Sequence, residues 1–439
     1  MAKVPRGGML GLCVTQVADG RVLGAHAADR RLSMASLTKL YVSAAALAEL
    51  GPNHEFRTRM HALGPIRDGS CPGLVVVGGG DPCLDEHFTD GDPDAVFRDW
   101  AARLASAGVE RIDGDLIIDG SMFSGPIRPA TYPGDARNIQ RWYCAPASAF
   151  AWNDNCIEVR VVPASPGQPA LVETRPDSPR ITIDNNTRSL GSGGSKGLVA
   201  WRHQHANTVV VNKHYSSTTS WFPFAIHEDP DLLAGDHLAT VLAQAGIALS
   251  GQVRRGTVPA DAPLLFTVRN PLTPALNILN QRSQNFYGEQ ILRVLGHARH
   301  GTGSLETGIA ATTAVLTEHG LDAAGFTLLD GSGLSYGNEA SARSVVDLLA
   351  LMAAHPHAVI YHDSLKQRQV PLPGGGTLTI KVKTGHLAIA HCLAGYITDD
   401  HGRRYAFACI ANRAGARSVA WGDRTIRGFV ADVVAALRD

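Results

Sequence analysis

Apolar and polar residues alternate near the start of the chain in a way that predicts a β-hairpin followed by a helix. Residues 8–27 alternate with the period of a strand and turn at Asp19-Gly20. Thr38–Leu50 then carries apolar and small residues at helical spacing, and Gly51-Pro52 ends the run as a helix-stopping pair. The first segment is therefore expected to contribute two strands and one mostly buried helix.

The last third of the chain shows the same mixture of periods. Two helical patterns flank a short polar segment, and a glycine turn leads into strands before a final helical pattern. The predicted elements are helices over Leu272–Gln281 and Phe286–Ala298, a hairpin turning at Gly374–Gly376, a second hairpin of Cys392–Thr398 and Tyr405–Asn412, and a helix over Ser418–Leu437.

The middle third has a different texture, with short strands, many prolines and loops. Leu116–Ile118, Ile157–Val162 and Thr208–Val211 are strand candidates, and Gly191–Gly197 has the composition of a flexible loop tip. We therefore predict a mixed α/β (α+β) fold in which a β-rich insertion splits one domain. The expected boundaries are 1–55 for the first segment, 56–263 for the insertion and 264–439 for the second segment.

Composition narrows the function. A chain of 439 residues exceeds one ordinary core, and 44% hydrophobic with 18% charged residues is typical of globular protein. The formal net charge is zero without a basic stripe, so we expect no nucleic-acid partner. No apolar run approaches 18 residues, which predicts no transmembrane segment.

The N-terminus and the cysteines bear on the compartment. Met1–Arg6 is basic but no apolar signal region follows, so the chain as written is expected to be cytoplasmic. A preceding segment would change that expectation to periplasmic or extracellular. The 7 cysteines are scattered and form no CxxC, which predicts buried free thiols rather than disulfides or a zinc ribbon.

The strongest chemical signal is Ser36-Leu37-Thr38-Lys39 at the start of the first predicted helix. A helix brings positions i and i+3 to one face, so Lys39 can take a proton from the Ser36 hydroxyl. Such a base must be neutral, and both burial and a neighbouring cation lower a lysine pKa. The four residues thus supply a nucleophile and its base.

Two later segments complete this chemistry. Lys383 of Lys383-Thr384-Gly385 can supply the second cation or hold a substrate carboxylate, and Ser283 of Ser283-Gln284-Asn285 can relay a proton to the leaving group. Asn285 can hold a substrate amide, while the backbone N–H groups of Ser36 and His386 can form an oxyanion hole. A lone SxxK pattern is weak, but the three segments in this order are typical of penicillin-binding proteins and class A β-lactamases.

At these residues the chain resembles the penicillin-binding protein 4 family, the S13 peptidases or D-alanyl-D-alanine carboxypeptidases. The similarity covers nearly the whole chain. Besides the three motifs, blocks of family type occur in family order at Ala35–Tyr41, Gly78–Pro82, Tyr143–Ala149 and Asp330–Ser335.

The resemblance implies a split transpeptidase-like catalytic domain, an antiparallel sheet with helices on both faces, and a large insertion. It implies that a D-Ala-D-Ala-terminated peptide, such as a peptidoglycan stem, acylates Ser36 and that water then removes the acyl group. β-Lactams would acylate the same serine, and no cofactor or metal is expected. The residues carried over by position are Ser36, Lys39, Ser283, Asn285 and Lys383 as catalytic groups, with Thr384, Gly385, His386, Leu387, Asn138, Tyr143 and Tyr336 around the substrate.

Several of these positions depart from the family pattern. His386 stands where Thr or Ser is usual. In the pocket for the substrate side chain, Asn138 replaces an acidic residue and Tyr336 replaces an arginine. Unless Asp135 or Arg141 substitutes, the pocket is expected to prefer a less charged acyl group than a diaminopimelate-type end. Gln284, in the middle of the second motif, is a further departure.

Two other functions remain open from the sequence. A cytoplasmic esterase, amidase or peptidyl acyltransferase or cyclase would keep the acyl-enzyme but change the substrate. A non-catalytic binding protein would not need a base and both lysine motifs. Weaker site candidates are interpreted as structural: His203, His205 and His214 as surface histidines, Asp85–Asp94 as a solvated loop and helix start, and Trp152 with Asn153–Asn155 as a turn into the next strand.

Overall fold

The computed structural model describes residue 4 and residues 6–371, 377–413 and 420–436. It divides into two compact units, one made of 1–54 with 271–439 and the other of 55–270. The first boundary lies one residue from the predicted one, while the second lies after 270 instead of 263. The reason is strand β17 (Leu264–Pro271), which adds to a sheet of the second unit beside β4 (Glu55–Ala62). Whether either unit folds as an independent domain stays a prediction.

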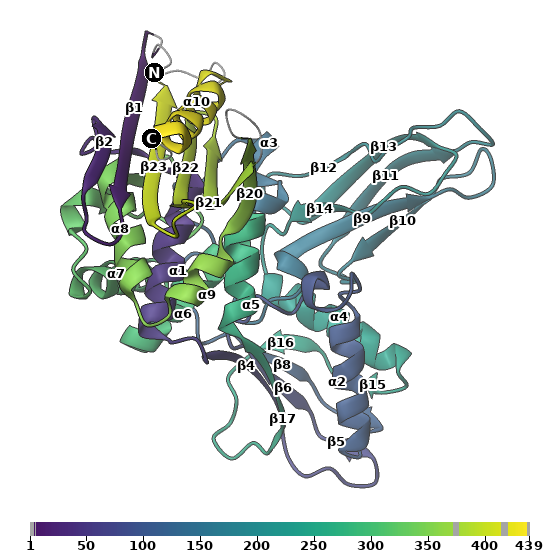
Figure 1. The fold of residues 1–439 in the computed structure, drawn as a ribbon. Coiled ribbons are helices and arrows are strands. Elements are labelled where there is room, and N and C mark those ends of the chain that lie inside the picture. Colours follow the sequence, from purple (N-terminus) through teal and green to yellow (C-terminus); the bar gives the residue numbers. More distant parts are fainter. Residues whose placement is uncertain (1–3, 5, 372–376, 414–419, 437–439) are drawn as a thin grey trace. The chain divides into compact units, whose positions relative to one another are not determined.

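A six-stranded antiparallel sheet organises the first unit, in the order β2-β1-β23-β22-β21-β20 (Figure 1). Its first and last strands in sequence pair along their full length, from Gly8 opposite Arg413 to Gln16 opposite Tyr405. The three predicted hairpins are present, although the turn at Gly374–Gly376 lies outside the described residues. The strands are β1 (Gly8–Gln16), β2 (Val22–His26), β20 (Lys366–Pro371), β21 (Thr377–Leu387), β22 (Ala390–Thr398) and β23 (Arg404–Arg413).

Helices cover both faces of this sheet, as predicted. Helix α10 (Ala420–Ala436) lies on one face, where Ile426 and Val430 pack on sheet residues such as Ile380 (Figure 1). Helix α8 (Ala342–Ala354) contacts β1, β22 and β23 from the other face. The remaining helices of the unit are α1 (Thr38–Glu49), α5 (Leu272–Asn277), α6 (Asn285–His300), α7 (Leu305–Glu318) and α9 (Ala358–Ser364).

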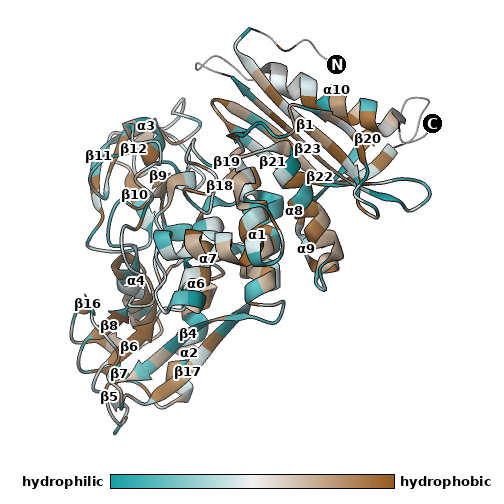
Figure 2. Ribbon diagram, turned by 90° about the vertical axis from the view of Figure 1, so that its left-hand side faces the viewer, coloured by the Kyte–Doolittle hydropathy of each residue, from teal (hydrophilic) through white to brown (hydrophobic). Residues whose placement is uncertain are grey.

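Helix α1 is buried along nearly its whole length, from Thr38 to Leu47. Figure 2 shows it among α6, α7 and α8 rather than at the surface. A helix that is apolar all round is stable only inside a core. The amine of Lys39 on this helix is therefore held away from water, and this disfavours its charged form.

The predicted helix 272–281 is present but changes form at its end. Helix α5 stops at Asn277, and Ile278–Arg282 continues as a π-helical turn. Ser283 then adopts a left-handed conformation with φ 61° before α6 begins. Single π-turns of this kind are frequent at functional sites.

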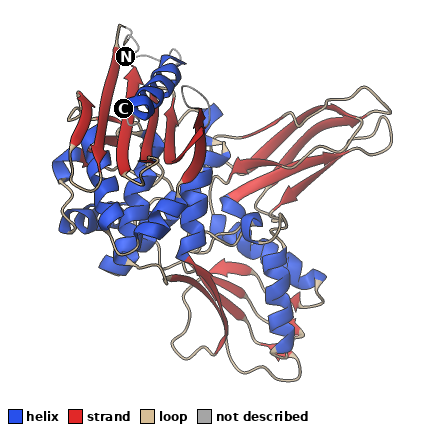
Figure 3. Ribbon diagram, in the orientation of Figure 1, coloured by secondary structure: helices blue, strands red, loops and turns tan. Residues whose placement is uncertain are grey.

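The second unit is rich in strands, as Figure 3 shows. A five-stranded sheet, β16-β8-β6-β4-β17, packs with α2 (Ala95–Ser106) and α4 (Pro230–Gln244) around Trp100, Trp152 and Phe97. Three smaller sheets complete it, and the three predicted strands are observed as β8, β9 and β13. The strands not yet given are β5 (Ser70–Cys71), β6 (Leu74–Val77), β7 (Arg111–Ile112), β8 (Leu116–Asp119), β9 (Cys156–Val162), β10 (Leu171–Arg175), β11 (Thr182–Ser189), β12 (Ala200–Arg202), β13 (Thr208–Tyr215), β14 (Phe222–Ala225), β15 (Ala248–Leu249) and β16 (Val253–Arg255).

Two further expectations concern cysteines and membranes. All seven cysteines are buried free thiols, as predicted. Among the described residues, we find no helix with the length and apolar character needed to cross a bilayer.

Candidate active site

Ser36 lies in a single 3-10 turn, Ala35–Leu37, directly before α1. Ala35 has φ 48°, a left-handed conformation that is uncommon for a residue with a side chain. Two glycines allow other segments to approach this turn. A Cβ at Gly333 would lie 2.1 Å from the Ala35 carbonyl oxygen, and one at Gly385 would lie 2.8 Å from the Met34 carbonyl oxygen. The nucleophile is thus clamped between the loop at Gly333 and strand β21.

Lys39 reaches Ser36 from the first turn of α1. Its Nζ lies 3.1 Å from Ser36 Oγ and donates to Asn285 Oδ1 at 2.8 Å. It also donates to the backbone carbonyl of Ser332. Three segments of the chain therefore fix the amine beside the serine hydroxyl, so little reorganisation is needed for proton transfer.

The environment of Lys39 suits a base. Burial lowers its pKa from 10.5 to about 7, and the nearby carboxylates of Asp330 and Glu289 partly oppose that shift. A general base is most effective when its pKa lies near the working pH. A substantial share of Lys39 is therefore neutral at pH 7 and able to accept the Ser36 proton.

Ser283 and Lys383 form a second pair. Lys383 Nζ donates to Ser283 Oγ at 2.7 Å and to the carbonyl of Thr384 at 2.8 Å. Burial is the main cause of a pKa well below the ordinary value for Lys383, and the charge of Lys39 adds to it. The left-handed backbone of Ser283 places its hydroxyl toward this lysine, which connects α6 to β21.

The end of β21 has an open edge. β20 pairs with β21 only as far as Val382, whereas β22 pairs with it as far as Leu387. Lys383–Leu387 therefore keeps an edge on which an extended peptide can add as a strand. Ile380 and Val382 of β21 pack in one cluster with Ile426 and Val430 of α10, so by alternation Thr384 and His386 face α10 and Lys383 faces the other side of the sheet.

The sequence did not indicate how Lys39 is supported. Asp330 is fully buried and accepts the backbone N–H groups of Ser332, Gly333 and Ser335, which shapes the loop whose carbonyl holds Lys39. Glu289 accepts the N–H groups of Gly331 and Ser332 in the same loop at 3.0 Å each, so it shares the Ser332 N–H with Asp330. The block Asp330–Ser335 was a signal, because it is of family type, but its role depends on contacts across the fold.

Glu289 also forms a buried ion pair. Its Oε2 lies 3.0 Å from Arg293 one helical turn later, and both side chains are 2% exposed. Arg293 thus holds the Glu289 carboxylate behind the loop, and its positive charge offsets the negative charge that Glu289 places near Lys39.

The residues predicted for the substrate side-chain pocket divide between the two units. Tyr336 follows the loop of Asp330 in the first unit and is 45% exposed. Asn138 and Tyr143 belong to the second unit, where the Tyr143 hydroxyl donates to Asn138 Oδ1 at 2.6 Å. The Asn138 amide donates to Asp135 Oδ2 at 2.7 Å, so a carboxylate stands next to the position where the family has one.

The weaker candidates are partly reinterpreted. His203, His205 and His214 are exposed, as expected, and the turn at Asn153–Asn155 leads into β9. The stretch Asp85–Asp94 is not simply solvated: Asp85 is buried, and Asp94 lies 2.8 Å from His237 Nε2.

One group in the second unit has the composition of metal ligands. Asp85, His87 and Asp154 bring one ligand atom each within 4.8 Å of one another. Each of these residues also has other interactions within the protein, and we assign no ion there.

Comparison with known proteins places this geometry in a family. The sequence profile described as the D-Ala-D-Ala carboxypeptidase 3 (S13) family matches residues 1–431. A "D-alanyl-D-alanine carboxypeptidase" of Actinomadura sp. (strain R39) is 30% identical over 433 residues, which cover 92% of this chain and 78% of that protein.

A solved structure has the same fold. Penicillin binding protein 4 (dacB) from Haemophilus influenzae aligns with a TM-score of 0.77 at 21% identity, covering 95% of this chain and 93% of that one. A second structure of that protein, complexed with a novel β-lactam, aligns with a TM-score of 0.72 at 20% identity, covering 95% and 92% of the two chains. The resemblance carried by Ser36, Ser283 and Lys383 is thus confirmed: this chain belongs to the D-Ala-D-Ala carboxypeptidase 3 (S13) family.

Proposed function

We propose that this protein is a serine DD-peptidase that cleaves peptides ending in D-Ala-D-Ala through an acyl-enzyme on Ser36. The observation that carries the proposal is the pairing of Ser36 Oγ with a buried lysine of lowered pKa at 3.1 Å. Family membership supports the reaction class. Peptidoglycan stem peptides are the substrate class that such an ending implies.

Acylation follows from the roles of four groups. Lys39 takes the Ser36 proton as Oγ attacks the carbonyl carbon of the penultimate D-alanine. The N–H groups of Ser36 and His386 stabilise the oxyanion, a contribution typically worth about 3 kcal/mol per donor. When the C–N bond breaks, Ser283 passes its hydroxyl proton to the leaving amine and takes up the proton that Lys39 received, so both Ser283 and Lys39 return to their starting forms. Lys383 at 2.7 Å holds the Ser283 hydroxyl in place.

Deacylation uses the same base. Water attacks the ester carbonyl, Lys39 receives a proton from the water, and Ser36 Oγ recovers a proton as the acid product leaves. Asn285 holds Lys39 at 2.8 Å through both steps and offers its amide group to the substrate backbone. No cofactor enters this sequence.

β-Lactams are proposed as covalent inhibitors, because their strained amide reaches the same serine. The relative from Haemophilus influenzae has been crystallised with one. A labelled penicillin is expected to add its mass to the wild-type protein and not to Ser36→Ala, measured on the intact proteins. A wild type that takes up no label would contradict the acyl-enzyme with β-lactams.

Asn138 and Tyr336 favour one alternative, an esterase, amidase or acyltransferase with a less charged acyl group. D-Alanine release from a diacyl-D-Ala-D-Ala peptide separates the two. Strong thioester turnover without D-alanine release would favour the alternative. The compartment is a separate proposal, cytoplasmic or else periplasmic or extracellular, and fractionation of cells that make the protein from its natural gene would decide between these.

A further inference from the structure

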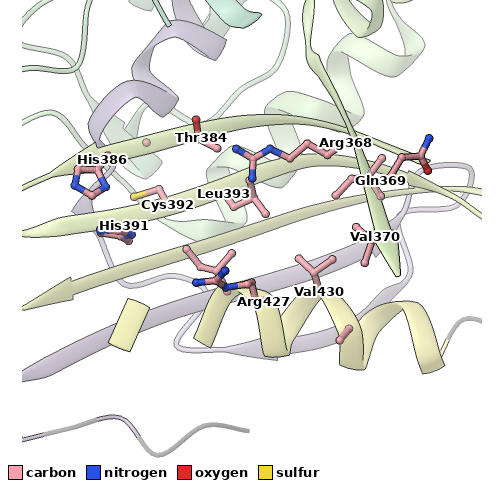
Figure 4. Close-up of a pocket in the computed structure, with 14 residues that line it drawn as sticks. Arg368, Gln369, Val370, Thr384, His386, His391, Cys392, Leu393, Arg427 and Val430 are labelled. Carbon is pink, nitrogen blue, oxygen red and sulfur yellow. The ribbon is translucent and has the colours of Figure 1, made fainter. Parts of the chain in front are cut away.

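Two features of the first unit have no part in the mechanism above. One is a pocket of about 770 Å³ whose lining includes Thr384 and His386 (Figure 4). Because these residues lie on the strand that carries Lys383, the pocket borders the candidate active site and belongs to it. The other feature is a cluster of three histidines at the ends of helices α7, α8 and α9.

The three histidines occupy helix-cap positions and contact one another. His319 follows the last residue of α7, His355 follows α8, and His357 precedes α9. The ring centres of His319 and His355 are 5.8 Å apart, and those of His355 and His357 are 5.2 Å apart. The end of one helix and the turn between two others thus place three imidazoles side by side.

These separations suit a shared metal ion. With Zn–N bonds of about 2.0–2.1 Å in tetrahedral geometry, the centres of two ligating rings lie about 5 Å apart. Imidazole is a preferred ligand of zinc, copper and nickel. The long helices α7 and α8 present their carboxyl ends to the cluster, where the helix dipole favours a cation, whereas the short α9 presents its amino end. Ring spacing and the two long helices therefore both favour a bound cation.

Hydrogen bonds indicate which ring nitrogens can bind the ion. The contact of His319 Nδ1 with the Val315 carbonyl oxygen at 2.8 Å requires a proton on Nδ1, so Nε2 keeps its lone pair. A backbone carbonyl in this role fixes the tautomer of many metal-binding histidines. His355 Nδ1 accepts the backbone N–H of His357 at 3.2 Å and so also has a lone pair. Burial, and next the charges of His357 and His319, lower the pKa of His355, which favours the neutral form that binds metals.

The three rings must rotate to surround an ion. Among the described residues, these histidines do not yet form a closed ligand set, and their rings pack at interplanar angles of 52° and 62°. His319 is exposed, and His355 and His357 are half-buried, so the side chains have room to change rotamer. Rotation of His355 gives up only the hydrogen bond from His357, whose 3.2 Å is at the long end of the usual range.

We propose that His319, His355 and His357 form a binding site for a divalent transition-metal ion such as zinc, with water in the remaining position. The ion would join the end of α7 to the turn between α8 and α9. Both parts support the helix that carries Lys39: α7 packs on α1, and the Tyr361 hydroxyl of α9 donates to the Leu40 carbonyl at 3.2 Å. Metal binding is therefore expected to stabilise the first unit, and this site does not depend on the proposed function.

Calorimetric titration with zinc alone tests the site. The full chain, stripped of metals with EDTA, is compared with His319→Asn, His355→Asn and His357→Asn. Asparagine keeps a hydrogen-bonding group near the position of Nδ1 but is not a usual zinc ligand. We expect each variant to lose at least about tenfold in zinc affinity. Cobalt(II) gives a second readout, because its visible absorption reports the ligands of the ion and should weaken in each variant.

Two control variants separate this site from other histidines. His300 is exposed at the end of α6, so His300→Asn should leave zinc binding unchanged. His87→Asn tests the group formed with Asp85 and Asp154 in the second unit. Zinc binding that persists in all three cluster variants, or that is lost only in His87→Asn, would overturn the proposal. A wild type that takes up no zinc would overturn it as well.

Thermal unfolding shows whether each variant folds and where zinc acts. Without metal, the cluster variants should have a Tm within about 2 °C of wild type. Saturating zinc should raise the Tm of wild type by at least about 2 °C and leave the Tm of the variants unchanged. An equal rise in wild type and variants would contradict the proposal. If one variant fails to fold, the other two decide the outcome.

Discussion

Lys383 Nζ and Ser283 Oγ are 2.7 Å apart, and this hydrogen bond joins strand β21 to the turn before α6. The contact orients a hydroxyl whose backbone is held in a left-handed conformation. Strain of this kind costs about 1–3 kcal/mol and persists where the surroundings enforce it. The geometry thus keeps a proton donor ready for the leaving group.

Ser283→Ala should reduce activity more for a substrate with an amine leaving group than for one with a thiolate leaving group. An amine must be protonated as it departs, whereas a thiolate leaves without help. We expect kcat for a D-Ala-D-Ala peptide to fall about 10²–10³-fold, within the usual range for a general acid, and thioester turnover to fall less than tenfold.

Ser106→Ala, on the exposed end of α2, serves as the control for this variant. Steady-state rates with both substrates measure the effect. If the amide and the thioester lose activity equally, Ser283 has a structural role and not that of a proton donor.

The acylation rate should depend on pH through Lys39. Its pKa is lowered to about 7, and only the neutral amine accepts a proton, so the rate rises as pH increases through 7 and then levels off. Stopped-flow acylation by a penicillin between pH 5 and 9 gives the midpoint. His386→Thr should leave that midpoint in place, which separates Lys39 from the imidazole beside the site. A flat profile from pH 5 to 8 would rule out this assignment.

Glu289→Gln should affect stability and the pH profile together. It leaves Arg293 buried without its partner charge, which costs about 3–5 kcal/mol in the free energy of unfolding. Because the carboxylate raises the pKa of Lys39, its loss should move the acylation midpoint to lower pH.

Urea unfolding and the pH profile measure these two effects. Glu318→Gln breaks a pair with Arg299 in which Glu318 is 55% exposed, and should cost about 1 kcal/mol or less. An unchanged midpoint in Glu289→Gln would show that this carboxylate does not influence the base.

Gly333→Ala should displace the turn Ala35–Leu37, which carries the nucleophile Ser36. Its φ is +83°, and the new methyl group would lie 2.1 Å from the Ala35 carbonyl oxygen. We expect a loss of at least tenfold in the penicillin acylation rate, because the turn of Ser36 must shift.

Gly301→Ala provides a control with the same kind of backbone and open space. Its φ is +74° with no atom within 4 Å of the added Cβ, so only the conformational cost of about 1 kcal/mol applies. Equal acylation rates in the two variants would show that the approach to Ala35 has no part in positioning Ser36.

Local patterns predicted most of the fold. Helix α1 and the hairpin of β22 and β23 follow from periodicity and turn residues within each segment. The π-turn Ile278–Arg282 could not be predicted, because it depends on the packing of its neighbours. Strand β17 was not predicted, because it forms by pairing with β4, which lies far from it in the sequence.

The sequence likewise identified only part of the candidate site. The motif residues Ser36, Ser283 and Lys383 were identified from spacing and order, and the structure brings them into one unit. Their supports were not identified: the Ser332 carbonyl and the carboxylates of Asp330 and Glu289 act through contacts between distant segments. Their roles in catalysis stay predictions until the variants above are measured.

The pairing of β1 with β23 has a consequence for how the protein is made. The ribosome delivers Ser36 early, but β23, β22 and the β21 strand that bears Lys383 emerge only after the whole of Glu55–Asn270. Because domains generally fold as they emerge, the second unit can be complete while the nucleophile still lacks its oxyanion strand. If the second unit folds by itself, we expect the protein to gain its acyl-transfer chemistry as one of the last steps of synthesis, with Ser36 unreactive in the nascent chain until then.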